Sequence, residues 1–202
     1  MFRRNSILAL DVTKGVFFLV GSIIINHFAS VYADIWASNS VTDIVLDNIP
    51  VMDVDSILSY GALFFAIFVV IASLLSLKRI PFILKSIALF IFVRSIFIML
   101  THLGPSPEKT PIDDGIFLGR LLSGNDLFFS GHTGLPFLLA LIFWDVPLVR
   151  WISIGVSVIF GTAVLLGHLH YSIDVFSAFF ITYSVFRMAQ YFFAKDWEIA
   201  RK

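Results

Sequence analysis

Long apolar stretches separated by short polar links dominate this chain. A helix needs roughly 20 apolar residues to cross about 30 Å of hydrocarbon, and its backbone groups must be paired within the segment. No stretch alternates with a period of two, as a membrane β-barrel would. The pattern predicts an all-α, polytopic integral membrane protein, a bundle of six transmembrane helices at Ile7–Ala29, Leu58–Leu77, Ile80–Leu100, Phe128–Trp144, Trp151–Gly167 and Asp174–Phe193.

The links between the predicted spans complete the organisation. Gly104, Pro105, Pro107 and Pro111 interrupt the chain between spans three and four, which predicts a loop there. No internal repeat is evident, and neither end carries a pattern typical of a soluble module. We therefore expect a single six-span membrane domain over residues 1–202.

The amino terminus admits a second interpretation. Arg3 and Arg4 precede an apolar stretch, and residues 31–33 could serve as a small-residue cleavage site of a signal peptide. However, Asp11 and Lys14 interrupt the stretch, which is long enough to span a membrane. An uncleaved first span is the preferred expectation.

Lysine and arginine positions predict the orientation. Cytoplasmic links carry an excess of these residues. If the chain has six spans, the lysines and arginines near the span ends all fall on one side of the membrane, which is therefore predicted to be the cytoplasmic side and to hold both termini. These residues are Arg3, Arg4, Lys78, Arg79, Arg150, Arg187, Lys195, Arg201 and Lys202. The link from Val31 to Ile57, on the opposite side, has five aspartates and no Lys or Arg.

Composition narrows the functional classes. Of the 202 residues 58% are hydrophobic, 23 are phenylalanine and only 14% are charged, which is too apolar for a soluble domain of this length. The net charge of zero gives no support for a nucleic-acid partner. Because there is no cysteine, disulfides and thiolate chemistry are excluded, and zinc or iron–sulfur centres lose their commonest ligand.

The predicted topology gathers ionisable residues on one side of the membrane. Arg94 lies in the outer half of span three, His132 near the outer start of span four, and His170 and Asp174 at the outer turn between spans five and six. Ionisable groups in such segments are expensive and are usually functional. We expect a site on the non-cytoplasmic face, whether lumenal, periplasmic or extracellular.

The segment Ser130-Gly131-His132-Thr133 has the composition of an anion site. Ser or Gly before a helix provides a cap and exposed backbone N–H groups, and these bind anions. His132, just inside the helix, can donate a proton to a leaving oxygen. A lone histidine at the end of a span can equally be an interfacial or packing residue.

The spacing of His170 and Asp174 indicates a catalytic pair. Four residues apart, the carboxylate can reach the Nδ1–H of the imidazole, which leaves Nε2 as a nucleophile or base. An ion pair at a helix end is the structural alternative. Arg94 provides a planar, permanently charged fork that suits phosphate oxygens, although it could also pair with a buried carboxylate. Lys85, nearer the cytoplasmic edge, is expected to snorkel.

Together these segments resemble the type 2 phosphatidic acid phosphatase (PAP2) superfamily, and within it the sphingomyelin-synthase-like branch. Residues 125–133, NDLFFSGHT, are similar to its Gly-Asp-x-Leu-[Tyr/Phe]-Ser-Gly-His-Thr, and residues 168–175, HLHYSIDV, to its His-x-His-Tyr-Thr-x-Asp-Val. Arg94, Thr101 and Leu103 match an Arg-x6-Thr-x-Leu-Pro pattern, except that Gly104 replaces the proline. The resemblance covers about residues 80 to 193, the expected catalytic core.

This resemblance implies an enzyme and its roles. His170 would attack phosphorus or activate an acceptor hydroxyl, Asp174 would orient it, and His132 would protonate the departing oxygen. No metal or other cofactor is expected. The residues expected to bind substrate or support the site are Arg94, Asp126, Ser130, Gly131 and Tyr171. The substrates would be a membrane phospholipid and a lipid alcohol such as diacylglycerol or ceramide, so the expected activity is transfer of a phospho-head-group between them.

Departures from the family pattern affect the expected substrate. The phosphatase branch carries Lys-x6-Arg-Pro and a Ser-Arg pair six to seven residues before the last histidine. Here Arg94 stands at the lysine position, Thr101 at the arginine position, and residues 162–166 contain no arginine. A doubly charged monoester requires several cations, whereas one arginine suits a singly charged diester. Lys109 or Arg120 could add charge, so a lipid phosphate phosphatase that uses water remains the alternative.

Two further classes stay open. In one, His132 and His170 ligate haem b between facing helices, which a Soret band would reveal. That function leaves Arg94 and Asp174 without a role. In the other, the chain is a transporter or scaffold whose polar residues are structural, and His170→Ala would then leave its activity unchanged.

Overall fold

The computed structural model describes residues 2–110 and 127–201, and the regular elements in these ranges are all helical. Six of the helices in the described ranges have 12 or more residues and are called the long helices: α1 (Phe2–Ile35), α2 (Asp55–Leu74), α3 (Ile80–Leu100), α5 (Gly131–Ile142), α6 (Pro147–Leu166) and α7 (Ser172–Phe192). Three are short: η1 (Leu46–Asn48), η2 (Leu77–Arg79) and α8 (Ala194–Ala200). The prediction of an all-α fold is confirmed for the described residues.

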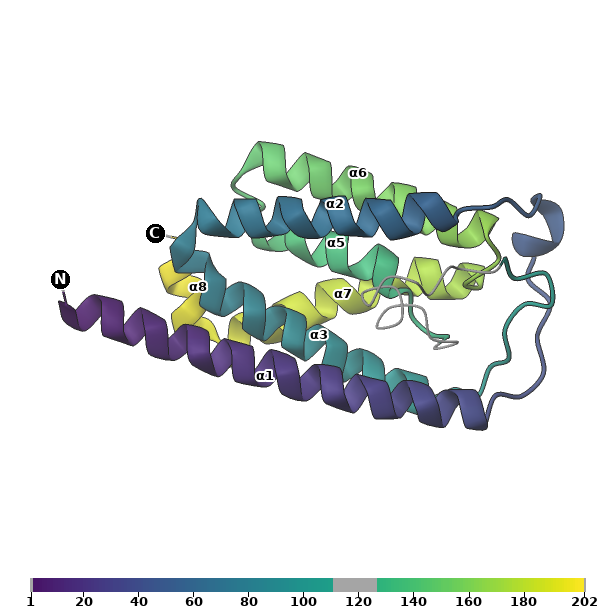
Figure 1. Cartoon of the computed structure of the whole chain (residues 1–202), viewed down its shortest axis with the longest axis horizontal. Coiled ribbons are helices and arrows are strands. Elements are labelled where there is room, and N and C mark those ends of the chain that lie inside the picture. The colour runs from purple at the N-terminus through teal and green to yellow at the C-terminus, as the bar shows by residue number, and fades with distance from the viewer. Residues whose placement is uncertain (1, 111–126, 202) are drawn as a thin grey trace.

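The long helices lie side by side and alternate in direction (Figure 1). α1 packs along α3, α2 packs on α6, and α5 contacts α3, α6 and α7. Both ends of the chain lie at one end of the bundle. The opposite end, called the loop end here, carries the first loop (residues 36–54) and the second loop (residues 101–110).

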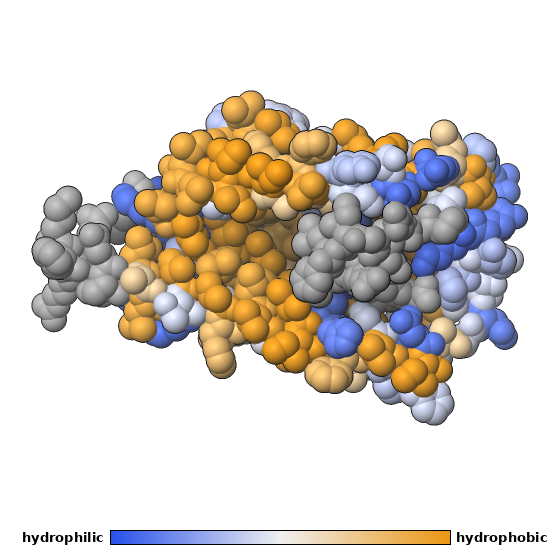
Figure 2. Space-filling view, viewed as in Figure 1, coloured by the Kyte–Doolittle hydropathy of each residue, from blue (hydrophilic) through white to orange (hydrophobic). Residues whose placement is uncertain are grey.

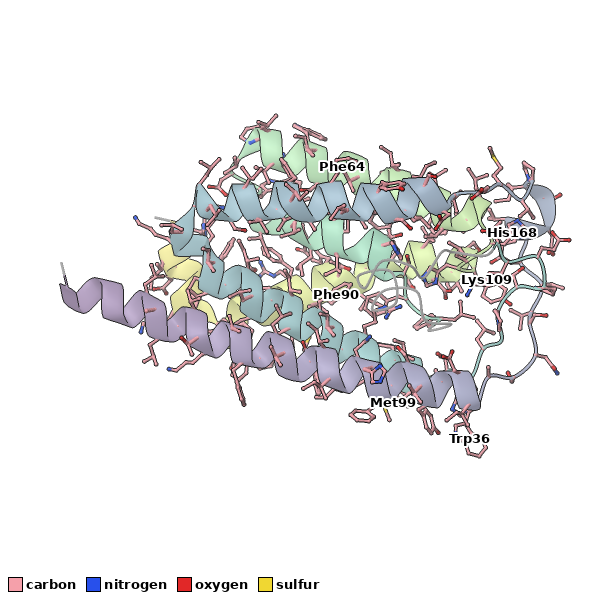
Figure 3. The ribbon with its side chains drawn as sticks, in the orientation of Figure 1. Trp36, Phe64, Phe90, Met99, Lys109 and His168 are labelled. Carbon is pink, nitrogen blue, oxygen red and sulfur yellow. The ribbon has the colours of Figure 1, made fainter. Side chains whose placement is uncertain are left out.

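The surface fits a multi-pass membrane protein. Among the described residues, five helical segments are long and apolar enough to cross a bilayer: Leu8–Ile35, Asp55–Leu74, Leu77–Leu100, Pro147–Leu166 and Ser172–Phe192. Apolar residues cover the middle of the molecule, whereas hydrophilic residues gather at the loop end (Figure 2). Phe64, 68% exposed, lies on the outward side of α2, while Phe90 is buried in the bundle (Figure 3). A soluble domain does not expose an apolar surface of this extent.

The fourth predicted span differs from the other five. In place of Phe128–Trp144 the structure has α5, a helix of only 12 residues. At 1.5 Å per residue it is about 18 Å long, which is shorter than the hydrocarbon layer. Eight of its residues are buried, because α3, α6 and α7 enclose it. The expectation of six full spans is therefore not confirmed, although α5 occupies the place of the fourth.

Close packing holds α5 in the centre. A β-carbon on Gly134 would lie 2.7 Å from the Phe90 ring and 2.8 Å from Thr182 Oγ1. Glycine at this position therefore lets α5 approach α3 and α7 closely. Phe90 and Leu138 are among the fully buried residues of the surrounding core.

Ion pairs tie the helices at the end opposite the loops. Lys85 Nζ lies 2.5 Å from Asp196 Oδ2 in α8, and both residues are less than 9% exposed. The expectation that Lys85 snorkels is wrong, because α8 folds back and supplies a carboxylate. Arg79 pairs with Asp145 and also donates to the Ile142 carbonyl. Its guanidinium lowers the pKa of Asp145.

The two loops are joined by backbone hydrogen bonds. Ser38 N–H donates to the His102 carbonyl at 2.8 Å, and Gly104 N–H to the Asn39 carbonyl at 3.2 Å. A β-carbon on Gly104 would lie 2.2 Å from the Ser38 carbonyl oxygen. This contact explains why glycine stands where the family pattern has proline: neither a side chain nor a proline ring fits there, and proline has no N–H to donate.

We predict that Gly104→Ala separates the two loops and lowers the free energy of unfolding by about 1–3 kcal/mol. Gly155→Ala is the matched control, because a β-carbon there has nothing within 4 Å and alanine favours the helix. Thermal unfolding of both variants in detergent measures the difference. Equal unfolding temperatures for the two variants would contradict the proposed crowding at Gly104.

Candidate active site

The start of α7 carries the first part of the candidate site. His170 Nδ1 lies 3.2 Å from Asp174 Oδ2, and the same oxygen accepts the Tyr171 N–H at 3.1 Å. Asp174 is fully buried and His170 is 8% exposed. A carboxylate only accepts hydrogen bonds, so this contact suits the His170 tautomer that carries its proton on Nδ1 and a lone pair on Nε2. The spacing-based prediction of contact between these two residues is confirmed.

The start of α5 carries the second part. Ser130 is the N-cap residue, and its Oγ accepts the Thr133 N–H at 3.4 Å. Gly131 and His132 form the first turn, so their backbone N–H groups belong to the set that a helix leaves without internal partners. The predicted cap at Ser130 is therefore present.

Hydrogen bonds join the starts of these two helices. Ser130 N–H donates to the Asp174 carbonyl at 3.0 Å. On the other side of α5, Ser157 of α6 donates to the Thr133 carbonyl at 2.7 Å. A β-carbon on Gly161 would lie 3.2 Å from Thr133 Oγ1, so α6 approaches this turn closely. The two histidine segments, distant in sequence, are thus adjacent in the fold.

Arg94 of α3 lies beside the first of these segments. It is 8% exposed, and its Nε donates to the Phe129 carbonyl at 3.0 Å. A β-carbon on Gly131 would lie 3.4 Å from Arg94 Nε, which places the guanidinium beside the start of α5. A permanent positive charge therefore lies next to the positive end of a helix dipole, an arrangement that favours an anion.

His132 is half-buried in the first turn of α5. Its ring packs edge-on against Phe160 of α6, with 6.2 Å between the ring centroids. His168, the first histidine of the second motif, is buried at the loop end (Figure 3), and its Nδ1 lies 3.9 Å from Glu108 Oε2. Asp126 and Arg120, both considered from the sequence, lie outside the described residues.

Tyr171 is held by the two loops. Its ring is 2% exposed and packs with Leu46 and Leu127. Its hydroxyl donates to the Gly104 carbonyl at 2.9 Å and accepts the Val41 N–H at 3.2 Å. Its polar atoms are therefore engaged with the backbone, an arrangement that fixes the residue next to His170.

Asp43 of the first loop reaches the same turn, and the sequence did not single it out. Its Oδ2 accepts the Ser172 N–H at 2.6 Å, and its Oδ1 accepts the N–H groups of Val45 and Leu46 at 2.8 and 3.2 Å. Burial opposes the charge, but the hydrogen bonds from these three residues outweigh it and hold the pKa of Asp43 below its ordinary value. No local signal distinguishes Asp43 from the other aspartates of this loop.

Metal ligation has no support among the described residues, since they contain no group of three or more His, Cys, Asp or Glu side chains placed to hold an ion. What they provide is a buried histidine–aspartate pair, a second histidine, an arginine and a capped helix start. This set can bind an anion, donate a proton and offer a nitrogen lone pair.

Fold and geometry together define a helical multi-pass membrane protein with a cluster of histidine, aspartate and arginine side chains towards one end of the bundle. Residues 123–191 match the family model described as PAP2 superfamily C-terminal, and this match supports membership of the PAP2 superfamily. Members are membrane-bound phosphatases and phosphotransferases that act on lipid phosphates. Comparison with curated proteins and with solved structures gave no match.

Proposed function

We propose that the chain is a membrane lipid phosphotransferase that moves a phospho-head-group from a phospholipid to a lipid alcohol. The observation that carries this proposal is the buried His170–Asp174 pair at the start of α7. The start of α7 is hydrogen-bonded to the start of α5, and Arg94 lies beside the start of α5. The site lies on the non-cytoplasmic face, in agreement with the position of the Lys- and Arg-poor first loop at the same end of the bundle.

The assigned roles rest on the family resemblance and are supported by the geometry. Arg94 and the N–H groups at the start of α5 bind the phosphate oxygens. Asp174 keeps the proton on His170 Nδ1 and stabilises the positive charge that the ring gains. His132 donates a proton to the oxygen that leaves phosphorus. Tyr171, with its hydroxyl engaged by both loops, is assigned a positioning role in place of direct contact with substrate.

Two routes use these groups. In the first, His170 Nε2 attacks phosphorus, the bond to the donor's glyceride oxygen breaks, and His132 protonates that oxygen. The hydroxyl of the acceptor lipid then attacks the phosphohistidine, returns its proton to His132 and restores His170. In the second, His170 removes the proton from the acceptor hydroxyl, whose oxygen attacks phosphorus directly while the bond to the donor's glyceride oxygen breaks and His132 protonates that oxygen. Transfer of a proton from His170 to His132 then restores both side chains. The routes differ in whether an acid-labile phosphohistidine forms.

The polar atoms around the site favour a phosphodiester over a monoester. At the position of the phosphatase arginine, the Thr101 hydroxyl lies 3.1 and 3.3 Å from the carbonyl oxygens of Phe97 and Leu127. In the region of the phosphatase Ser-Arg pair, Ala163 and Val164 are buried and apolar. A dianion requires more compensating charge than these residues supply, whereas Arg94 and a helix start suit a monoanion.

Product analysis tests the proposal. The purified protein is incubated with head-group-labelled phospholipid, with and without diacylglycerol or ceramide, and the lipid and aqueous products are separated. We expect a new labelled lipid only when acceptor is present. Release of a water-soluble phosphorylated head group regardless of acceptor would overturn the transferase and favour the hydrolase. The same samples with phosphatidic acid, read out as inorganic phosphate, test the phosphatase alternative.

A further inference from the structure

Resting on the proposed function, we propose that Asp43 is a positioning residue that holds His170 in its reactive orientation from the first loop. Asp43 lies 127 positions before His170 in the chain and belongs to neither histidine motif. It is 8% exposed, and its carboxylate receives its hydrogen bonds from backbone N–H groups.

Two carboxylates divide the backbone N–H groups at the start of α7. Asp174 takes the Tyr171 N–H, and Asp43 takes the Ser172 N–H. A helix leaves its first N–H groups without internal partners, so each capped amide fixes the backbone of that turn. His170 directly precedes these two residues. Its ring position therefore depends on both carboxylates, although only Asp174 touches it.

Asp43 is itself held rigidly. Its second oxygen is bound to Val45 and Leu46 N–H, which fixes the side chain within its own loop. Leu46 is 5% exposed and packs with Tyr171 and Leu127. Leu127 lies three residues before Ser130, so the same cluster adjoins the segment that leads to His132. Asp43 is thus connected to both histidine segments through the buried cluster of Leu46, Leu127 and Tyr171.

Asp43 acts as an ionised group. Its lowered pKa agrees with a carboxylate that receives N–H donors from both loop and helix. Asparagine at this position keeps one acceptor oxygen but turns an N–H group towards a second donor. Alanine keeps neither acceptor. The two substitutions should therefore weaken the turn in a graded way.

The test has an activity arm and a spectroscopic arm, both on the full chain in lipid nanodiscs. Asp43→Ala is expected to lower kcat about 10- to 100-fold, because misplacement of a reactive group by about 1 Å costs that much, while KM stays within about twofold. Asp43→Asn is expected to fall between this variant and the wild type. Asp47→Asn is the matched control, since Asp47 is an exposed aspartate of the same loop. It should match the wild type.

The spectroscopic arm does not depend on the substrate. In protein labelled with 15N-histidine, Asp43→Ala and Asp43→Asn should shift the ring signals of His170, assigned with His170→Ala, and leave those of His27 unchanged. If Asp43→Ala does not fold, Asp43→Asn decides. Unchanged His170 signals in a folded Asp43 variant would overturn the inference, as would an unchanged kcat. If the wild type moves no head group, the proposed function fails, and the ring signals still test the positioning role.

Discussion

His170→Ala should abolish head-group transfer, with a loss of at least about 10³-fold in kcat. The substitution removes the nitrogen lone pair that the proposal assigns to attack on phosphorus or to proton removal, and groups that act as one unit cannot replace one another. His170→Gln tests whether a polar side chain without the imidazole ring can replace the histidine. Transfer rates from labelled phospholipid to ceramide, measured with equal amounts of folded protein, give the effect.

The control for this prediction is His27→Ala. His27 lies on the exposed side of α1, where its ring contacts Phe28. Its removal should leave the rate within about twofold of the wild type, since it lies outside the segments that form the site. Residual transfer activity of His170→Ala above a tenth of the wild type would reject the role assigned to His170.

Asp174→Asn should lower kcat by about 10²- to 10⁴-fold, the range expected when a histidine loses the carboxylate that fixes its tautomer. In the wild type Asp174 Oδ2 accepts from both His170 Nδ1 and Tyr171 N–H. The asparagine amide would turn towards these groups either its neutral oxygen, a weaker acceptor than a carboxylate, or its NH2 group, which cannot accept the Tyr171 N–H. The pH–rate profile of the variant should also change, because the proton on the ring no longer has a charged partner.

Asp196→Asn separates this catalytic effect from lost stability. Asp196, like Asp174, is buried and has a side-chain partner, Lys85, but it lies at the end of the bundle remote from the loops. Breaking a buried pair leaves an uncompensated charge and lowers the unfolding temperature. The kcat of the folded fraction should nevertheless remain near that of the wild type. Equal losses of kcat in both variants would mean that Asp174 acts only through stability.

Local patterns predicted those features that depend on residues close in sequence. Hydropathy located the long helices because an apolar segment becomes a helix wherever its backbone must be satisfied internally. The contact between His170 and Asp174 was predictable because it follows from four-residue spacing at a helix start. The same reasoning correctly located the cap at Ser130.

Other features depend on what surrounds a segment. The length of α5 was overestimated because hydropathy cannot distinguish a helix that faces lipid from one enclosed by other helices. The fate of Lys85 depended on α8 folding back to it. The contact of Asp43 with Ser172 joins residues 129 positions apart through two loops, and no spacing rule connects them.

The depth of Arg94 within α3 affects the hydration of the phosphate that it is proposed to bind. Arg94 lies six residues before Leu100, where α3 ends, so its Cα lies about 9 Å below the rim of that helix. A phosphate that reaches it must leave the hydrated layer of the bilayer surface and shed water. Shedding water costs a dianion more than a monoanion, and in the proposed transferase a lipid hydroxyl held at equal depth competes with water for the phosphorus. The cost of dehydration, as well as contacts with side chains, would then determine which phosphate ester reacts and which acceptor receives the phospho-head-group.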